Sequence, residues 1–217
     1  MKEIKVRIEF TEMVLGTANN NKEVHSDYIA SKAPDAKSKT EEIAAIGVDG
    51  MEEKSMTVFP RDAEGNPIFW DYQIKGFFKD TCSALQRCKG EEFSKASCGM
   101  KAYKKIIDGC IFVQPRQIHI DMHGGKMGTL QRPLRAQTMQ GERIALATSE
   151  TIPAGSTIDI TIVCLSDDHE KAVMEWLDYG RWKGIGQWRN GGYGRYLWNY
   201  IDDEGNLYGG NNDKAIK

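Results

Sequence analysis

Two histidines and one aspartate alternate with apolar residues in the segment HIDMH, residues 119–123. On a strand, His119, Asp121 and His123 would share one face, spaced about 6–7 Å apart in steps of two residues. The histidines of such a face could transfer protons in RNA cleavage, its three side chains could hold a metal ion, or it could be a solvated strand face. We treat His119 and His123 as candidate catalytic residues and expect no bound metal and no other cofactor.

Glycine, aromatic and cationic residues gather in a second segment, GIGQWRNGGYGR, residues 184–195. Each glycine within an ordered element costs about 0.5–1 kcal/mol relative to alanine, so five of them indicate a tight turn or a close backbone approach. The segment follows a helical pattern and precedes a strand, which is the reverse of a dinucleotide fingerprint or a P-loop. Both of these nucleotide sites are therefore excluded.

The side chains of this segment suit contact with nucleic acid. Trp188 and Tyr193 could stack on bases, and Arg189 and Arg195 could pair with phosphates. The alternative is a tight hairpin that packs for its own sake, with Trp188 in the core.

Charge is unevenly distributed along the chain, although the formal net charge is only −2. Residues 17–66 contain ten acidic and six basic residues, whereas residues 101–145 contain eight basic and three acidic ones. The second of these segments includes a basic loop with Arg132, Arg135 and Arg143. These arginines and the cations of residues 180–196 could form a surface that attracts phosphate, or they could be ordinary solvated charges.

The hydrophobic pattern predicts the elements that position these segments. Residues 4–10 alternate apolar and charged side chains, as a half-buried strand does. Next come a strand with Phe69, Trp70 and Tyr72, a helix over residues 77–87 and a short helix over residues 100–107. Two extended runs around Pro115 and two strands around a turn at 153–155 follow. The last elements are a helix over 167–180, with Gly180 as its C-cap, and a strand over 195–201. The core order of strand, helix, strand, strand, helix, strand predicts a ferredoxin-like α+β fold, in which two helices cover one face of an antiparallel sheet.

The 217 residues are expected to form one domain over residues 1–201. Within it we expect an acidic insertion at 17–53 and a long loop or hairpin at 124–141, followed by a loosely ordered tail at 202–217. Five cysteines without CxxC spacing indicate reduced thiols, with a zinc site as the alternative. No signal peptide or membrane span is evident, so a cytoplasmic protein is expected.

Three stretches in this order resemble the RAMP superfamily, the RNA-binding subunits and processing enzymes of CRISPR systems. They are the glycine-rich segment GIGQWRNGGYGRY, the segment YQIKGFFKDTCSALQR and the strand pair ETIPAGSTIDITIVCL. The resemblance covers roughly residues 1–16 and 67–201, and only the glycine-rich segment is specific. The usual serine-rich approach to Lys-Gly is replaced by YQI, and residues 17–53 have no counterpart in the family.

The resemblance implies an RRM-like, ferredoxin-like core whose glycine-rich loop lies against RNA or a neighbouring subunit. The binding residues that it implicates by position are Lys75, Lys79, Gly184, Gly186, Trp188, Arg189, Gly192, Gly194 and Arg195, to which the residue types add Tyr193, Arg132 and Arg135. Arg132 and Arg135 lie where RAMP backbone subunits carry a protruding hairpin that touches RNA. The chain also looks like proteins carried by phages and prophages of gut bacteria.

These features predict a non-catalytic protein that binds RNA or a nucleotide, with subunits of a CRISPR or other defence complex as possible partners and self-association left open. Two alternatives remain open at this point. One is a phage-encoded antidefence protein that inhibits a CRISPR complex or captures a signal nucleotide. The other is a metal-independent endoribonuclease that uses His119 or His123.

Overall fold

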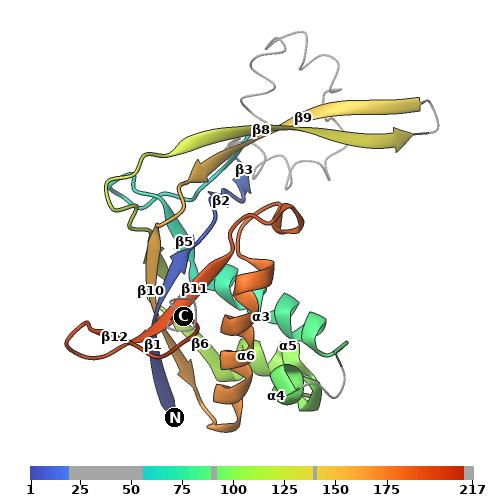
Figure 1. Ribbon diagram of the computed structural model, residues 1–217. Coiled ribbons are helices and arrows are strands. Elements are labelled where there is room, and N and C mark those ends of the chain that lie inside the picture. The colour runs from blue at the N-terminus through green and yellow to red at the C-terminus, as the bar shows by residue number, and fades with distance from the viewer. Residues whose placement is uncertain (20–55, 89–91, 139–140, 213–217) are drawn as a thin grey trace, which may run out of the picture. The chain divides into compact units, whose positions relative to one another are not determined.

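The computed structural model describes residues 1–19, 56–88, 92–138 and 141–212 (Figure 1). The acidic segment expected at 17–53 lies outside the described residues from position 20 onward. By their contacts, the residues divide into two compact units. The first unit comprises Met1–Val14, Pro60–Lys126 and Ile152–Lys217, and the second comprises Leu15–Phe59 and Met127–Thr151.

A five-stranded sheet forms the centre of the first unit, in the order β12-β11-β1-β10-β6. Its strands are β1 (Lys2–Phe10), β6 (Ile111–Gln114), β10 (Thr157–Cys164), β11 (Tyr196–Ile201) and β12 (Leu207–Tyr208). Every neighbouring pair in this sheet is antiparallel. A separate two-stranded sheet joins β5 (Ile68–Trp70) to β7 (Gln117–His119).

The alternation in the sequence decides which face of the sheet is covered. Ile4, Val6, Ile8 and Phe10 of β1 are buried, and the charged residues between them point to the opposite face. Strand β10 pairs with β1 so that Ile158, Ile160 and Ile162 lie on the same buried side. The hydrophobic strand face is therefore the one on which helices must pack.

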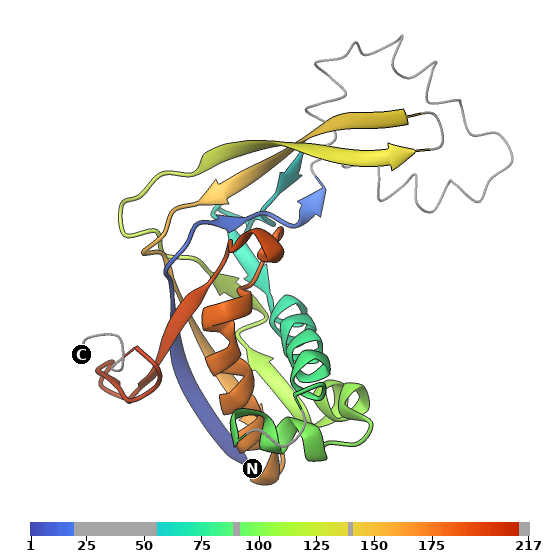
Figure 2. The same ribbon diagram turned by 45° about the vertical axis from the view of Figure 1, so that its right-hand side comes forward.

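Helices cover that apolar face. The helices are α3 (Asp71–Leu85), α4 (Lys95–Gly99), α5 (Tyr103–Cys110) and α6 (Asp168–Lys183), with two short 3-10 turns, η1 (Glu92–Ser94) and η2 (Arg189–Gly191). Helices α3 and α6 lie side by side against the sheet (Figure 2). Between them, the rings of Phe78 and Trp176 are 5.3 Å apart, and both side chains are fully buried.

Helices combined with antiparallel sheets make this an α+β protein, the class expected from the sequence. Helix boundaries differ from the prediction: the helix expected at 100–107 is α5 at Tyr103–Cys110, and the start of α3 and the end of α6 also differ. The expected strand with Tyr72 ends at Trp70, because α3 already begins at Asp71, where the Trp70 backbone N–H donates to Gln73 Oε1 at 2.7 Å. Helix α6 continues past Gly180, whose missing side chain leaves room for the ring of Tyr196, and Gly184 is its C-cap.

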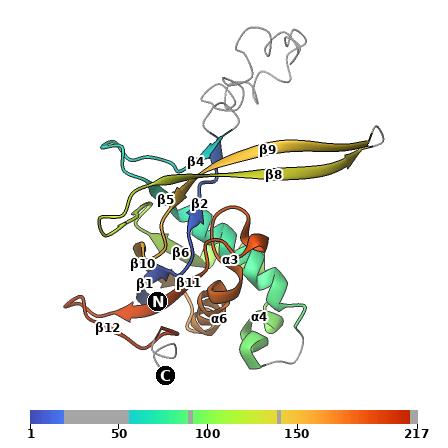
Figure 3. The same ribbon diagram turned by 45° about the horizontal axis from the view of Figure 1, so that its top comes forward.

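The second unit is built on a long hairpin, in which β8 (Gly128–Thr138) pairs with β9 (Gly141–Ile152) (Figure 3). Its sheet has the order β2-β9-β4-β3, with β8 also on β9. The short strands are β2 (Val14–Leu15), β3 (Ala18–Asn19) and β4 (Thr57–Val58). The segment expected as a loop or hairpin at 124–141 thus contains all of β8 and the first residue of β9.

The five cysteines are free thiols. Cys82 of α3 and Cys164 of β10 are buried in the first unit. Burial disfavours the thiolate and raises the pKa of each of these two thiols to about 11. Both are therefore protonated and unreactive at neutral pH, which is typical of structural cysteines.

Candidate nucleic-acid interface

The glycine-rich segment forms a compact loop between α6 and β11 in the first unit. Four of its five glycines adopt positive φ angles, namely Gly184 at 74°, Gly186 at 99°, Gly192 at 90° and Gly194 at 72°. This left-handed region is open to glycine and costly for other residues. The glycines are thus required first of all by the path of the loop.

Two of these glycines also bring the ends of the loop together. A Cβ atom on Gly194 would lie 1.8 Å from the carbonyl oxygen of Ile185, and one on Gly184 would lie 2.5 Å from the carbonyl carbon of Gly194. The Ile185 N–H donates to the Gly194 oxygen at 2.9 Å, and the Gly194 N–H donates to the Met13 oxygen at 2.9 Å. The close approach is therefore between the two ends of the loop itself, and it limits the conformations of the residues between them.

Trp188 belongs to this loop and has 41% of its surface exposed. Its indole stacks on the ring of Tyr193, with centroids 4.9 Å apart and planes 22° apart. A Cβ on Gly191 would lie 2.9 Å from the indole, so this glycine leaves space for the ring. The alternative that Trp188 is a core residue is therefore wrong.

Trp188 also has a strained backbone, with a φ of 49°. A non-glycine residue in this region costs about 1–2 kcal/mol. The other four positive-φ positions of the loop are glycines, whereas position 188 carries tryptophan, the largest side chain. Such strain is typical of functional positions.

The two arginines of the loop have different environments. Arg189 Nη1 lies 2.8 Å from Oδ2 of Asp80 on α3, and Lys183 Nζ lies 4.0 Å from the same carboxylate oxygen. Arg195 is exposed, and its guanidinium lies over Gly192. Arg195 forms no ion pair with any residue that the structure describes. Arg195 is thus the arginine of the loop that can take a phosphate without giving up an ion pair with a described residue.

The two lysines implicated on α3 face a different neighbour from the loop. Lys79 Nζ pairs with Asp108 Oδ1 at 2.6 Å, and Lys75 Nζ donates to the Asp108 carbonyl oxygen at 3.1 Å. Asp108 belongs to α5, whereas Asp80 of the same helix α3 contacts the loop. Lys75 and Lys79 therefore contact Asp108, whereas Arg189 of the loop contacts Asp80.

Arg132 and Arg135 belong to β8 of the second unit, and the loop belongs to the first. Arg132 is half-buried. The side chains of Arg135 and Arg143 lie outside the described part of the chain. The contribution of Arg132 and Arg135 to a binding surface therefore stays a prediction.

The two histidines of HIDMH contact different carboxylates. His119 is the last residue of β7, and its Nδ1 lies 3.3 Å from Asp62 Oδ2. His123 has a φ of 49° in a turn where its N–H donates to Asp121 Oδ1 at 2.8 Å. The segment is therefore not one regular strand, because the Asp121 side chain captures the backbone two residues later.

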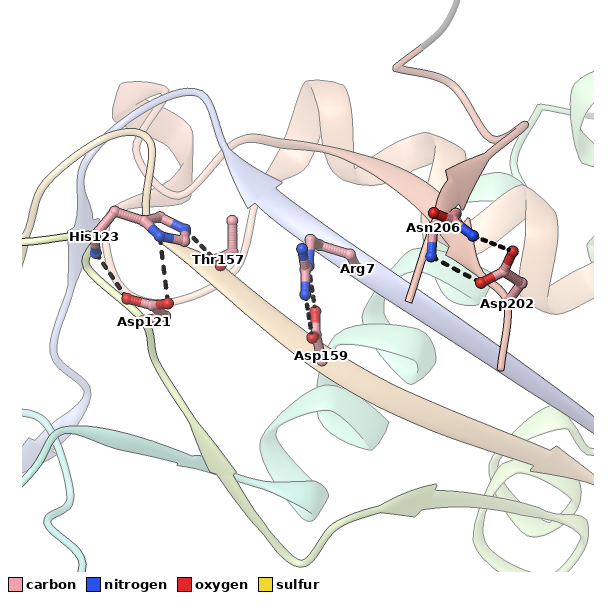
Figure 4. Close-up of polar contacts among 7 residues, drawn as sticks. All are labelled: Arg7, Asp121, His123, Thr157, Asp159, Asp202 and Asn206. Atoms are coloured by element: carbon pink, nitrogen blue, oxygen red, sulfur yellow. Dashed lines mark hydrogen bonds and ion pairs between the residues drawn. The ribbon is translucent and has the colours of Figure 1, made fainter. Parts of the chain in front are cut away.

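This turn assembles a polar group that the sequence did not reveal (Figure 4). His123 Nδ1 lies 3.3 Å from Asp121 Oδ2, and His123 Nε2 lies 2.9 Å from Thr157 Oγ1. Thr157 is distant in sequence, and the pairing of its backbone with Asp121 places it there. A carboxylate, an imidazole and a hydroxyl in this order can pass a proton from the hydroxyl to the imidazole.

Neither a metal centre nor a membrane span is found in the described chain. In the ranges 1–19, 56–88, 92–138 and 141–212, no group of three or more histidine, cysteine, aspartate or glutamate side chains is placed to hold a metal ion. None of the described helices is long and apolar enough to cross a membrane.

Comparisons with known proteins find likeness among solved structures. No protein-family model matches the sequence, and no curated protein matches it. Among solved structures, a chain from the "Cryo-EM structure of the Type III-B Cmr-beta bound to cognate target RNA" is similar at a TM-score of 0.45 and 12% sequence identity. The match covers 89% of this chain and 57% of the other, so this chain spans little more than half of that chain's length.

Proposed function

We propose that this chain is a non-catalytic, RAMP-like protein that binds single-stranded RNA with its glycine-rich loop. The exposed indole of Trp188, stacked on Tyr193 and held in a strained backbone conformation, is the observation that carries the proposal. A base contacts the exposed part of the Trp188 indole, and the exposed Arg195 of the same loop takes a phosphate. Stacking on aromatic side chains is the usual way in which proteins hold unpaired bases.

The topology of the first unit supports a ferredoxin-like core for this protein. The elements β1, α3, β6, β10, α6 and β11 follow in the order strand, helix, strand, strand, helix, strand. Their strands lie in the sheet as β11-β1-β10-β6, all antiparallel. In such a core the glycine-rich loop joins the second helix to the last strand.

The open face of the sheet is a poorer candidate for base stacking than the loop. RRM proteins stack bases on aromatic side chains of their central strands. Here the central strands β1 and β10 carry Arg7 and Asp159 at paired positions, joined by two hydrogen bonds of 2.7 and 2.6 Å (Figure 4). Their other outward residues are Glu3, Lys5, Glu9, Thr157, Thr161 and Val163. None of these side chains is aromatic, which favours the loop.

Arg195→Ala is expected to lower the salt dependence of RNA binding. Each phosphate contact with a single strand contributes about 0.7 to the slope of log affinity against log salt concentration. The slope should fall by about that amount in the variant, as measured by fluorescence anisotropy over a series of salt concentrations. Arg189→Ala is a less clean variant, because it also frees the carboxylate of Asp80.

Lys171→Ala is the matched control for this experiment. Lys171 is exposed near the end of α6 that is opposite to the loop. Its replacement by alanine removes one positive charge, as Arg195→Ala does, but away from the loop. An equal loss of slope in Lys171→Ala and Arg195→Ala would mean that general charge attraction, and not the loop, supports binding.

A second candidate function is metal-independent cleavage of RNA at His123, which the polar group of Asp121, His123 and Thr157 favours. The 2.9 Å contact between His123 Nε2 and Thr157 Oγ1 shows where an alcohol can meet the imidazole. A ribose 2′-hydroxyl at this place would lose its proton to His123 while Asp121 orients the ring.

If His123 is catalytic, the protein will cleave labelled RNA in the presence of EDTA. His123→Ala should then lose about 100-fold or more of the rate, which is the usual contribution of a general base. His119→Ala should keep the activity, because His119 contacts Asp62 and not this group. Intact RNA after incubation with the wild-type protein would exclude this candidate and leave the binding function.

A further inference from the structure

A second cluster of aromatic and cationic side chains lies where β5 passes into α3, outside the glycine-rich loop. The rings of Trp70 and Tyr72 are nearly parallel, with planes 11° apart and centroids 6.3 Å apart. The guanidinium carbon of Arg116 lies 5.9 Å from the centre of the Trp70 ring. Tyr72 has 60% of its surface exposed, so one aromatic face is open to solvent.

Backbone contacts fix the residues of this cluster relative to one another. The Asp71 N–H donates to the Arg116 carbonyl oxygen at 3.0 Å, and the Trp70 N–H donates to Gln73 Oε1 at 2.7 Å. Trp70 is also paired with Gln117 in the β5–β7 sheet. The backbone positions that carry Trp70 and Arg116 are thus tied together before any ligand arrives, which reduces the entropy lost on binding.

A second pair of a cation and a ring extends the cluster along α3. Lys75 Nζ lies 5.2 Å from the centre of the Phe112 ring, and Phe112 is an exposed residue of β6. Tyr72 and Lys75 are three positions apart on α3 and therefore neighbours on its surface. The cluster thus alternates exposed rings with cations.

The charges of the cluster favour an anionic ligand. The nearby carboxylate of Asp108 is already paired with Lys79. Neither Lys75 nor Arg116 forms an ion pair with a carboxylate of the described residues. Asp71, half-buried at the start of α3, is the acidic side chain closest in sequence to the rings. The members that face solvent are thus aromatic or cationic, which suits base stacking and phosphate pairing.

We propose that Trp70, Tyr72, Lys75, Phe112 and Arg116 form a second contact surface for single-stranded nucleic acid. An unpaired base stacks on the open face of Tyr72, and Arg116 and Lys75 take the phosphates on either side. The class of ligand rests on the function proposed for the loop, but the residues are independent of it. One strand in contact with both surfaces gains affinity from the second contact without any change in the first.

The test compares Tyr72→Ala, Tyr72→Phe and Arg116→Ala with the wild-type protein, using a fluorescein-labelled oligouridine as the probe. Tyr72→Ala should weaken binding about 5- to 150-fold, the effect of one lost base stack, and Tyr72→Phe should restore most of it. Arg116→Ala should lower the slope of log affinity against log salt by about 0.7. Thermal melting checks that each variant folds, which we expect because both side chains are exposed.

Tyr208→Ala is the matched control. Tyr208 has 55% of its surface exposed, and its ring stacks on Tyr200 at 5.3 Å. The second surface is overturned if the Tyr72 and Arg116 variants bind the RNA as well as Tyr208→Ala does. If those variants bind normally while Trp188 variants bind weakly, only this inference fails. If the wild-type protein does not bind the oligouridine, the proposed function fails with it.

Discussion

Gly194→Ala is expected to destabilise the first unit by about 2–5 kcal/mol. The left-handed backbone of Gly194 costs an alanine about 1–2 kcal/mol, and overpacking of a tight site adds about 1–3 kcal/mol. The new methyl group would lie 1.8 Å from the Ile185 carbonyl oxygen, which is backbone and cannot rotate away. The midpoint of thermal unfolding should fall by roughly 10 °C.

Gly205→Ala is the control that separates conformation from close approach. Gly205 has a φ of 87°, but nothing lies within 4 Å of the position where a Cβ would stand. This variant should therefore lose only the conformational part, about 1–2 kcal/mol. Equal losses of folding stability in the two variants would mean that the two ends of the glycine-rich loop do not lie as close together as in the structure.

Trp188→Gly should weaken RNA binding strongly and change folding stability little. Glycine relieves a backbone strain of about 1–2 kcal/mol, and this gain is offset by the loss of the stack on Tyr193, about 0.5–1.5 kcal/mol, and by glycine's greater flexibility. Loss of a stacked base should cost about 1–3 kcal/mol of binding free energy. Thermal melting and anisotropy titrations measure the two effects separately.

Trp188→Phe is the companion variant, because it keeps an aromatic face at the same position. It should retain most of the affinity that Trp188→Gly loses. A core tryptophan would behave differently, with about 3–5 kcal/mol of stability lost on truncation. Such a loss in Trp188→Gly would contradict the exposed position of the ring.

Regular alternation and helical spacing predicted the central elements well. The period of two in residues 4–10 corresponds to β1, and the strands expected on either side of the turn at 153–155 correspond to the end of β9 and to β10. The last strand, expected at 195–201, corresponds to β11. These patterns are reliable because burial on one face of a sheet dictates them directly.

The helix boundaries were predicted less well, because tertiary contacts decide them. Three neighbouring aromatic residues around Trp70 indicated a strand, but Gln73 accepts the Trp70 N–H and starts α3 at once. Gly180 had the sequence context of a C-cap, yet its role is to admit the ring of Tyr196 against α6. A glycine that makes room for a distant side chain cannot be distinguished locally from one that ends a helix.

The sequence predicted the tight loop that carries the candidate site, but it did not predict the pairings of the side chains. The glycine spacing of residues 184–195 predicted a tight loop, and four glycines of this loop have the positive φ angles that such a path requires. The partner of Arg189 is Asp80, more than a hundred positions away, so no local pattern could assign it. The same holds for Thr157 beside His123, which the pairing of two separated backbone segments brings into place.

The most direct test of the account is a titration of one labelled single-stranded RNA with the wild-type protein and with Trp188→Gly at the same salt concentration. The account predicts saturable binding by the wild-type protein and an affinity about 5- to 150-fold lower for the folded variant. Equal affinities for the two folded proteins, or no binding by the wild-type protein, would contradict the claim that this loop binds RNA.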